Sequence, residues 1–364
     1  MGKSPQVFLH VIDTTGPGGA ETIFTQLAFE TKRTENKTIA LIRGEGWVKS
    51  ELERLGIDVR VVDCKGSFNV KFLMQFIKLI RDEKVTRIQA HLLGSNVYAS
   101  IAGLICGVPV FSTFHGFVDV SKNERFSFFK FLAIRFGSKN VVAVTDQIRD
   151  MLIHIPVLDP KKIFVIANGV DTNIFKPLNP FEVAPLNLPI KIGCLGNVRK
   201  AKNYPLAIRV LESLVAKGMD IELYIAGDDK NKLADECRVL AKEYGVGNRL
   251  RFVGFINNAA EYLNSLDIYL LSSSSEGHPL ALTQAMACGI PVVATRCGIE
   301  HVVVDGDTAL LAENGNPESV VEKIINLIDS DELRKKMFEL APASVKESWS
   351  LSSTLANYLK MYSI

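Results

Sequence analysis

Short apolar runs alternate with longer amphipathic stretches along the first half of the chain. The run 7–12 is bounded by turn residues, which predicts a buried strand, and the pattern then turns helical up to about Thr31. Further strands are predicted at 38–42, 58–62, 87–90, 109–113, 140–144 and 162–166, with helices at 48–55, 70–83, 95–106 and 146–152. This alternation favours a doubly wound parallel sheet.

The pattern restarts after the proline-rich stretch 171–189, which we interpret as a linker between two domains. Strands are predicted at 190–195, 221–226, 250–253, 267–271 and 292–294, and helices up to 217 and at 230–244, 280–287, 317–328, 332–340 and 349–364. The chain of 364 residues is long enough for about two domains of ~150 residues. We therefore expect an α/β protein with one domain at 1–177 and a second at 178–347.

Composition narrows the classes of protein. A net charge of +2 argues against a nucleic-acid protein that relies on a broad basic field. The six cysteines show no C-x-x-C spacing, which is typical of buried thiols in a reducing compartment. The longest apolar region, 97–114, is broken by Gly103, Gly107 and Pro109, so it predicts a helix and a strand and no membrane span. With no signal segment at the N-terminus, we expect a cytoplasmic protein.

The polar segment after strand 267–271 is the strongest candidate for chemistry. Four serines, 272–275, lead into Glu276, and a helix is expected from Leu280. Ligands of open α/β sheets bind at the carboxyl ends of strands, and free N–H groups at a helix start suit a phosphate. A carboxylate in this place fits a polar pocket, but it fits a simple partner of the helix dipole equally well.

Three other strand ends carry candidate groups. Arg199 and Lys202 follow strand 190–195, where two cations could neutralise a diphosphate or form a solvated basic turn. The glycine-rich loop 13–21 could approach a phosphate or be a tight turn. His115 and His91 each follow a strand, where a role in a pocket competes with a structural one.

Several of these segments resemble one family. They are E-G-H-P at 276–279, A-M-A-C-G-I-P-V-V at 285–293, G-G-A-E at 18–21 and N-G-V-D at 168–171. Together they resemble the retaining glycosyltransferases of family 4, also called glycosyl transferases group 1. The resemblance implies the GT-B fold, in which two Rossmann-like doubly wound domains face each other across a cleft. It also implies that the final segment, 348–364, crosses back to pack on the first domain, and that 168–171 lies at the domain junction.

The resemblance implies an activity as well. Family members transfer a sugar from a nucleotide diphosphate to a glycan or a lipid-linked acceptor and retain the anomeric configuration, generally without a bound metal or other cofactor. A role in the synthesis of surface polysaccharide or another glycoconjugate is expected. We do not interpret Asp305-Gly306-Asp307 as a metal motif, because nothing nearby completes an oxygen shell.

Roles follow for individual residues. The resemblance places His115 near the reacting sugar, Glu276 on the donor sugar, and Arg199 with Lys202 on the diphosphate, and we take these four as catalytic. The further donor-binding residues that it implies are Gly18, Gly19, Gly196, Asn197, Gly277, His278, Leu280, Ala281 and Gln284. His91 and Glu21 are expected on the acceptor side.

Gln284 departs from the family pattern, in which a second glutamate follows Glu276 after seven residues. A carboxylate accepts from both hydroxyls of a ribose, whereas an amide accepts with one atom and donates with the other. Losing the charge-assisted bond costs about 1 kcal/mol, so we interpret Gln284 as a tolerated variant. A non-catalytic sugar-nucleotide-binding protein remains an alternative. So does a sugar-nucleotide epimerase on the same fold, for which we identify no set of acid and base residues.

The segment 122–139 interleaves phenylalanines with lysines and arginines. Such a composition suits the surface of an anionic membrane. A helix packed on its own sheet, with basic edges, is the alternative. In several family members the equivalent region touches membrane, so we expect a protein that is cytoplasmic or peripheral on the inner face of the cell membrane.

Overall fold

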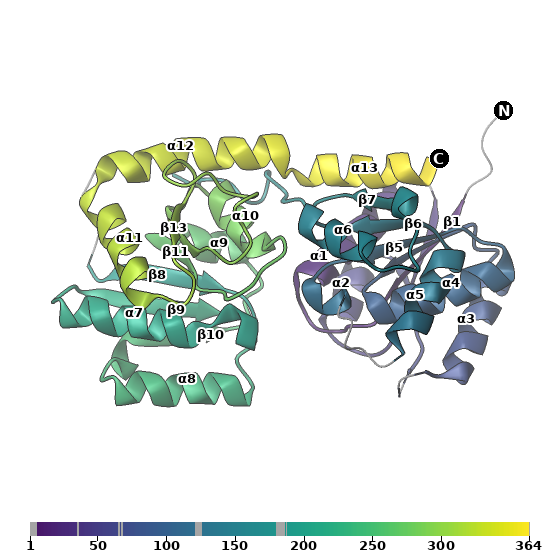
Figure 1. The fold of residues 1–364 in the computed structure, drawn as a ribbon, viewed down its shortest axis with the longest axis horizontal. Helices are drawn as coiled ribbons and strands as arrows, with labels where there is room; N and C mark the ends of the chain where they lie inside the picture. The colour runs from purple at the N-terminus through teal and green to yellow at the C-terminus, as the bar shows by residue number, and fades with distance from the viewer. Residues whose placement is uncertain are drawn as a thin grey trace. The chain divides into compact units, whose positions relative to one another are not determined.

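A computed structural model describes residues 6–34, 36–64, 66, 68–120, 126–179, 186 and 188–363. The chain divides into two compact units, which are Met1–Asn168 with Thr354–Ile364, and Gly169–Ser353. The pattern of the sequence had suggested divisions after 177 and after 347. Each unit contains one parallel sheet with helices packed on it (Figure 1). Part of the proline-rich linker, 180–185 and 187, lies outside the described residues.

The first unit is built on a seven-stranded sheet in the order β3-β2-β1-β4-β5-β6-β7. Every pair of neighbouring strands in it is parallel. The strands are β1 (Val7–Ile12), β2 (Lys37–Ile42), β3 (Asp58–Val61), β4 (Arg87–His91), β5 (Val110–Phe114), β6 (Ser138–Ala143) and β7 (Ile163–Val165). The order reverses between β1 and β4, and ligands of such sheets bind beside this point.

Helices cover both faces of this sheet because its apolar residues alternate. Leu9 and Val11 of β1 pack with α3 and α4, whereas Ile12 packs with α1 and α2. The helices are α1 (Gly19–Arg33), α2 (Trp47–Arg54), α3 (Val70–Asp82), α4 (Leu93–Cys106), α5 (Ser127–Gly137) and α6 (Asp146–Ile153). Helix α4 and strand β5 occupy the long apolar region, which confirms its interpretation as helix plus strand. No helix among the described residues combines the length and the apolar character that crossing a bilayer requires.

The last helix of the chain, α13 (Leu351–Ser363), belongs mostly to the first unit. Its buried residues Tyr358, Met361 and Tyr362 pack on Phe8 and Phe111 of the central strands. Thr354 also donates to the main-chain oxygen of Ala167 (2.9 Å). The expectation that the final helix returns to the first domain is therefore confirmed.

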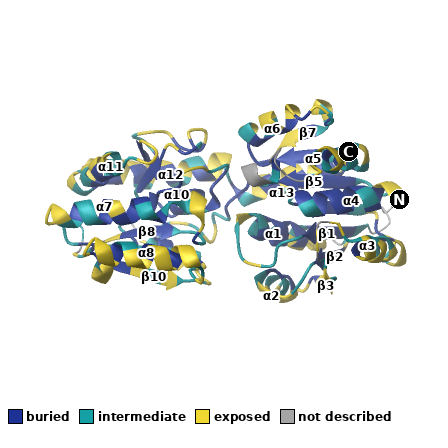
Figure 2. Ribbon diagram, turned by 60° about the horizontal axis from the view of Figure 1, so that its bottom comes forward, coloured by how far each residue is buried: buried dark blue, intermediate teal, exposed yellow. Residues whose placement is uncertain are grey.

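The second unit is built on a six-stranded parallel sheet in the order β10-β9-β8-β11-β12-β13. Its strands are β8 (Ile190–Leu195), β9 (Ile221–Ala226), β10 (Leu250–Gly254), β11 (Ile268–Leu271), β12 (Val292–Thr295) and β13 (Leu310–Ala312). Its helices are α7 (Tyr204–Ala216), α8 (Lys232–Glu243), α9 (Ala259–Asn264), α10 (Leu280–Ala287), α11 (Pro317–Asp329) and α12 (Asp331–Ser348). One face of the sheet packs with α7, α8 and α11, and the other with α10 and α12. In both units the inner strands are buried, the edge strands β3 and β10 are partly exposed, and the helices keep an exposed side (Figure 2).

Three elements of the second unit differ from the prediction. Helix α9 and strand β13 were not predicted, because six and three residues are too short to show a period. Helix α12 was expected to end at 340, before Pro342, but it continues to Ser348. A proline inside a helix removes one hydrogen bond. Ala341 and Val345 are fully buried on either side of this proline, and the apolar contacts that they make offset the loss.

Candidate functional site

The loop between β11 and α10 is fastened to the segments on both of its sides. Ser272 Oγ donates to the main-chain oxygen of Lys202 (2.8 Å), and Thr295 Oγ1 donates to that of Ser273 (2.6 Å). The main-chain N–H of Glu276 donates to the oxygen of Cys297 (2.8 Å). Because these bonds come from both neighbouring strand ends, the position of the Glu276 backbone is fixed before any ligand arrives.

The carboxylate of Glu276 is the electrostatic centre of this loop. Its Oε1 atom accepts from Lys202 Nζ (2.8 Å) and from Ser273 Oγ (2.7 Å). The side chains of Glu276 and Lys202 are 15 % and 20 % exposed, so both charges remain within reach of solvent or a ligand. The second oxygen, Oε2, accepts no hydrogen bond from any residue that the structure describes. It is therefore available to a hydroxyl group.

Gly196 lets the lysine side chain reach Glu276. A Cβ atom at this position would lie 2.8 Å from Lys202 Cε, and its φ of +151° also disfavours other residues. Asn197 has a different role, since its Oδ1 accepts from the main-chain N–H of Asp228 (2.9 Å) and holds the turn together. Arg199 is exposed, and its guanidinium contacts no described residue through a hydrogen bond or ion pair. It offers a free cation three residues from Lys202.

The start of α10 lies directly after this loop. The N-cap residue, Pro279, makes no capping bond through its side chain. Within the described chain, the main-chain N–H groups of Gly277, His278, Leu280 and Ala281 donate to no other residue. Unbonded N–H groups at a helix start carry partial positive charge and favour an anion. The loop, the lysine and the helix start thus combine groups of positive charge with the fixed carboxylate of Glu276.

Two predicted residues of this edge differ in what their side chains do. The His278 ring is 7 % exposed and lies 4.7 Å from the Trp349 ring, and neither of its nitrogens has a partner in the described part of the chain. Burial, with a contribution from His301, lowers the pKa of His278 to about 3. This ring is a packing group, and only the main chain of His278 is free to bind. Gln284 is half-buried, and its amide bonds to none of the described residues.

In the first unit, the structure brings the two candidate histidines together. His91 is fully buried at the end of β4, and His115 follows β5. Their rings are stacked with centroids 5.0 Å apart, and His91 Nδ1 lies 2.8 Å from His115 Nε2. Burial lowers the pKa of His115 to about 3 and also that of His91, so both rings are neutral. His91 is fully buried and contacts His115, and its expected place on the acceptor side stays a prediction.

Two carboxylates lie near these histidines. Asp119 Oδ2 accepts from the main-chain N–H groups of His115 (3.0 Å) and Gly116 (3.3 Å), which holds the loop after β5. Burial raises the pKa of Asp119 to about 6, although these two bonds oppose the shift, and Asp13 adds to it. Burial likewise raises the pKa of Asp13, although Arg43 beside it (3.8 Å) opposes the shift. Asp13 and Arg43 follow β1 and β2, so these groups share the carboxyl edge of the sheet.

The glycine-rich loop ends in the same unit. Gly18 is the N-cap residue of α1, and a Cβ atom there would lie 2.3 Å from Glu21 Oε2. A larger residue at this position would displace the carboxylate of Glu21, which is 7 % exposed and folds back over Gly18. Gly18, Gly19 and Glu21 thus belong to the first unit, whereas the other predicted donor residues belong to the second.

Sequence reasoning missed several residues of these two edges. Ser273 holds Glu276, Asp119 holds the loop of His115, and Gln89 contacts His91 (3.2 Å). The run of four serines was recognised as polar, but nothing in it singled out Ser273. Gln89 was hidden inside an apolar strand, where a buried amide could have served as the signal.

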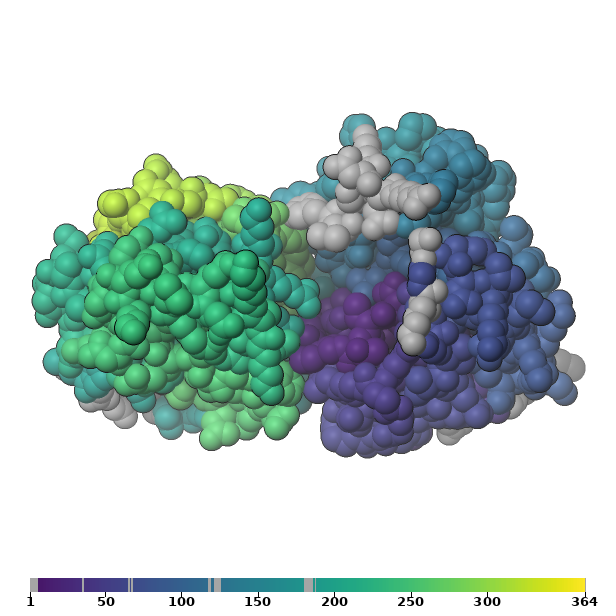
Figure 3. Space-filling view, turned by 90° about the horizontal axis from the view of Figure 1, so that it is seen from below, coloured from purple at the N-terminus to yellow at the C-terminus, as the bar shows by residue number. Residues whose placement is uncertain are grey.

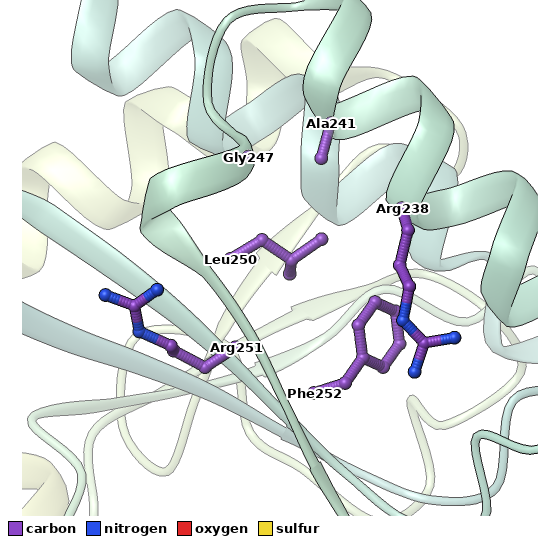
Figure 4. Close-up of a pocket in the computed structure, with 6 residues that line it drawn as sticks. All are labelled: Arg238, Ala241, Gly247, Leu250, Arg251 and Phe252. Carbon is purple, nitrogen blue, oxygen red and sulfur yellow. The ribbon is translucent and has the colours of Figure 1, made fainter.

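One cavity, of about 380 Å³, lies away from all the predicted residues. It is lined by Arg238, Ala241, Gly247, Leu250, Arg251 and Phe252 (Figure 4). Arg238 stacks over the Phe252 ring (4.5 Å) and pairs with Asp229 and Asp235, so its charge is already neutralised. Arg238 and Ala241 belong to helix α8, which lies on the face of the second unit that is seen from below in Figure 3. We assign no chemistry to this cavity.

Both carboxylates of Asp305-Gly306-Asp307, which we did not interpret as a metal motif, form ion pairs. Asp305 pairs with Arg296 (2.7 Å), and Asp307 pairs with Lys336 (2.6 Å). Among the residues that the structure describes, no group of three histidine, cysteine, aspartate or glutamate side chains is arranged to hold a metal ion.

Two family models match the chain. Residues 17–174 match the one described as Glycosyltransferase Family 4, and residues 178–343 match Glycosyl transferases group 1. Between them they cover most of both units.

Individual proteins are similar as well. N-acetyl-alpha-D-glucosaminyl L-malate synthase of Bacillus anthracis is 33 % identical over 243 residues, which is 63 % of this chain and 61 % of that protein, less than two thirds of its length. The UDP-Gal:alpha-D-GlcNAc-diphosphoundecaprenol alpha-1,3-galactosyltransferase of Escherichia coli is 25 % identical over 72 % of this chain and 71 % of that protein.

The fold is shared with solved structures. Anabaena HepE, whose crystal structure contains UDP and glucose, superposes with a TM-score of 0.85 over 98 % of this chain and 99 % of that one, at 19 % identity. At this identity the likeness establishes the fold alone, which is GT-B. On the two family matches, the chain belongs to the group 1 glycosyltransferases of family 4.

Proposed function

We propose that the protein transfers a sugar from a nucleotide diphosphate to a glycan or a lipid-linked acceptor and retains the anomeric configuration. The arrangement around Glu276 carries this proposal. One carboxylate with a free oxygen is held by Lys202 and Ser273 beside the unbonded N–H groups of α10. A sugar diphosphate needs both features, namely an acceptor for a sugar hydroxyl and donors for the phosphate oxygens.

In this proposal the diphosphate binds at the start of α10, close to Lys202 and within reach of Arg199. Negative charge grows on the diphosphate as the bond to the sugar breaks. Cations and N–H groups that are fixed in advance stabilise this charge without a reorganisation penalty. The same groups take the place of a metal ion, so we propose that transfer is independent of metal and persists in EDTA.

The reaction forms a bond between the acceptor oxygen and the anomeric carbon, and it breaks the bond from that carbon to the diphosphate. Retention follows if the acceptor hydroxyl attacks from the face that the diphosphate leaves. The proton of the hydroxyl passes to the departing phosphate oxygen. We propose that Glu276 Oε2 accepts from a hydroxyl of the donor sugar, and that His115 contacts the reacting sugar from the first unit.

The nucleotide can be identified by thermal shift. The panel contains UDP, GDP, ADP and their sugar conjugates, measured with the wild type and with Arg199→Ala. We expect one base to raise the melting temperature, and we expect Arg199→Ala to reduce that rise because it removes a cation from the diphosphate. If no nucleotide raises it, the donor site is degenerate, and the alternative of a protein that has lost its donor gains support.

We also propose that α5 contacts an anionic membrane that carries the acceptor. Three of its phenylalanines, Phe128, Phe129 and Phe136, are 58 %, 66 % and 62 % exposed, which is unusual for apolar side chains of this size. Lys139 and Arg135 flank them. Residues 121–125, including Lys122 and Arg125 of the predicted segment, lie outside the described residues. One relative is named for a diphosphoundecaprenol-linked acceptor, which fits a site at a membrane.

Vesicle flotation tests this surface. The wild type should bind vesicles that contain anionic lipid, and added salt should weaken the binding. Phe129→Asp should reduce binding, whereas Phe255→Asp should not, since Phe255 is also exposed (46 %) but lies in the second unit. Binding that is absent, or that both variants reduce equally, would contradict a role for α5.

A further inference from the structure

A chain of buried polar groups runs from the C-terminal helix to His115. Tyr362 of α13 donates from its hydroxyl to Gln89 Oε1 (2.8 Å). Gln89 Nε2 lies 3.2 Å from His91 Nε2, and His91 Nδ1 lies 2.8 Å from His115 Nε2. Gln89 and His91 are fully buried. A buried chain of this kind needs a donor and an acceptor at every link, because an unmatched buried group is costly.

The orientation of the Gln89 amide sets the direction of the chain. The atom facing His91 also contacts the main-chain oxygen of Ala90 (3.2 Å) and Thr113 Oγ1 (2.9 Å). A main-chain carbonyl oxygen only accepts, so the Gln89 atom beside it must be the N–H₂ group. The opposite atom is then the amide oxygen, which accepts from the Tyr362 hydroxyl as the distance requires.

The tautomers of both histidines follow from this direction. The Gln89 N–H₂ group has two protons and three neighbours, but its nitrogen does not accept hydrogen bonds. A proton on His91 Nε2 would therefore face another donor, so the proton of neutral His91 sits on Nδ1. His91 Nδ1–H donates in turn to His115 Nε2. His115 is left with its proton on Nδ1, and this atom is buried and has no partner among the described residues. Neutral histidine in water favours the opposite tautomer, with the proton on Nε2, so the protein imposes this state.

We propose that Tyr362, Gln89 and His91 are positioning residues that hold His115 as a neutral hydrogen-bond donor through Nδ1–H. This inference rests on the proposed function only in assigning the substrate as the oxygen that accepts this bond. A protonated Nδ1 cannot take a proton from the acceptor hydroxyl, so His115 does not act as a general base. A neutral N–H donor does not stabilise positive charge at the anomeric carbon either. The remaining role is to bind an oxygen of the reacting sugar.

The tautomers can be read directly by ¹⁵N NMR on the full chain with labelled histidine. The chain has six histidines, and single substitutions assign the signals. We expect His91 and His115 to carry their proton on Nδ1 at neutral pH and to show no exchange between tautomers. A proton on Nε2 of His115, or an averaged signal, would overturn the proposal.

Two variants of the same helix provide a matched pair. Tyr362→Phe removes the bond to Gln89 Oε1 and leaves the 3.2 Å contact with the Ala90 oxygen to hold the amide orientation, so the His115 signal should become a mixture of tautomers. Tyr358→Phe removes an equally buried hydroxyl that reaches Gln89 only through Thr113 (3.2 Å), and it should change the His115 signal less than Tyr362→Phe does. An unchanged signal in Tyr362→Phe, or the same change in both variants, would show that these tyrosines act only through packing.

Activity supplies a separate readout. Once a donor is identified, Tyr362→Phe should lower kcat by about tenfold, which is the usual effect of losing a group that orients a functional histidine. The KM for the donor should be nearly unchanged. The NMR result needs no substrate, so the two proposals fail separately. If His115 shows the Nδ1–H tautomer but no donor is used, the hydrogen-bond chain stands and the proposed function falls. If sugar is transferred but the tautomer is Nε2–H, the function stands and the chain falls.

Discussion

The carboxyl edges of the two sheets differ in the charge and in the exposure of their side chains. At the edge of the second unit, Lys202 and Glu276 are charged, partly exposed and bonded to each other, and Arg199 stands free beside them. At the edge of the first unit, His91 is buried and His115 is half-buried, and the two rings are neutral and bonded to each other. Both edges follow the ends of parallel strands, so the sheet alone does not decide the chemistry.

Under the proposed function, the two edges have different tasks. Charge is useful where a diphosphate must be held and its growing charge neutralised, and exposure leaves room for the ligand to enter. Neutral groups in a dry environment are useful where a sugar hydroxyl must be oriented without proton transfer. The predictions below test whether the two edges differ in this way.

The largest effect is expected from Lys202→Ala. It removes the cation that is bonded to Glu276 (2.8 Å), and the loss of one group that stabilises charge in the transition state lowers kcat by about 100-fold to 1,000-fold. Lys200→Ala is the matched control, because Lys200 lies in the same turn but is exposed and pairs with no described residue. Equal loss in both variants, measured as steady-state transfer, would mean that the edge acts only through its overall charge.

Replacing a histidine by phenylalanine should affect stability differently in the two units. The His278 ring has no hydrogen-bond partner in the described part of the chain, so His278→Phe should be at least as stable as the wild type at neutral pH. His115→Phe leaves His91 without its partner and should lower the free energy of unfolding by about 1–3 kcal/mol. Urea unfolding at pH 7.5 measures both, and equal destabilisation would remove this difference between the edges.

The His278→Phe variant should also change how the free energy of unfolding depends on pH. Above pH 6.5 the His278 ring is neutral in the folded and unfolded states, so it contributes nothing to the change with pH. As the pH falls from about 6.5 toward 3, only the unfolded chain takes up the proton, because burial lowers the folded pKa to about 3. The free energy of unfolding then falls by up to about 1.4 kcal/mol per pH unit for this group. His278→Phe should show a shallower loss of stability between pH 7.5 and 5 than the wild type, and an unchanged slope would contradict the assignment.

Arg199→Ala should weaken binding of the nucleotide diphosphate by about tenfold, the effect of losing one charge-assisted bond of ~1.4 kcal/mol. Stability should not change, since the side chain is exposed and bonds to no residue in the described chain. Arg209→Ala, an exposed arginine on α7, is the control for net charge. Calorimetric titration distinguishes them, and a similar loss of affinity in Arg209→Ala would argue against a direct contact.

The smallest effect is expected from Gln284→Glu, which restores the residue type found in the family pattern. Since the Gln284 amide bonds to none of the described residues, the change should disturb nothing else. Nucleotide affinity should stay the same or rise several-fold, by about 1 kcal/mol at most. A folded variant that no longer binds nucleotide would show that Gln284 is not a variant of a ribose contact.

Much of the fold could be predicted from the sequence, because buried parallel strands are short apolar runs and the helices between them are periodic. The elements that were predicted wrongly were either too short to show a period or contained a residue that misleads when only the local sequence is considered. β13 has three residues, and Pro342 lies inside a helix whose buried face outweighs the missing bond. Local patterns do not register such tertiary compensation.

The sequence allowed most individual residues of the candidate site to be recognised, but not the contacts between them. Glu276 and Lys202 were each recognised, yet the bond between them joins positions 74 residues apart. His91 and His115 were both singled out, but only the register of β4 beside β5 brings the rings together. Gln89 and Ser273 were missed for the same reason, since their importance lies in the neighbour that each contacts.

The most direct test of the central claim is transfer of a radiolabelled sugar from the nucleotide diphosphate that the protein binds. The labelled donor is incubated with a membrane lipid extract and, separately, with a panel of soluble glycans. We predict that label moves to an acceptor with the wild type and with Lys200→Ala, and that Lys202→Ala abolishes most of the transfer. A donor that binds the folded protein but never gives up its sugar to either set of acceptors would contradict the proposal that this edge catalyses glycosyl transfer.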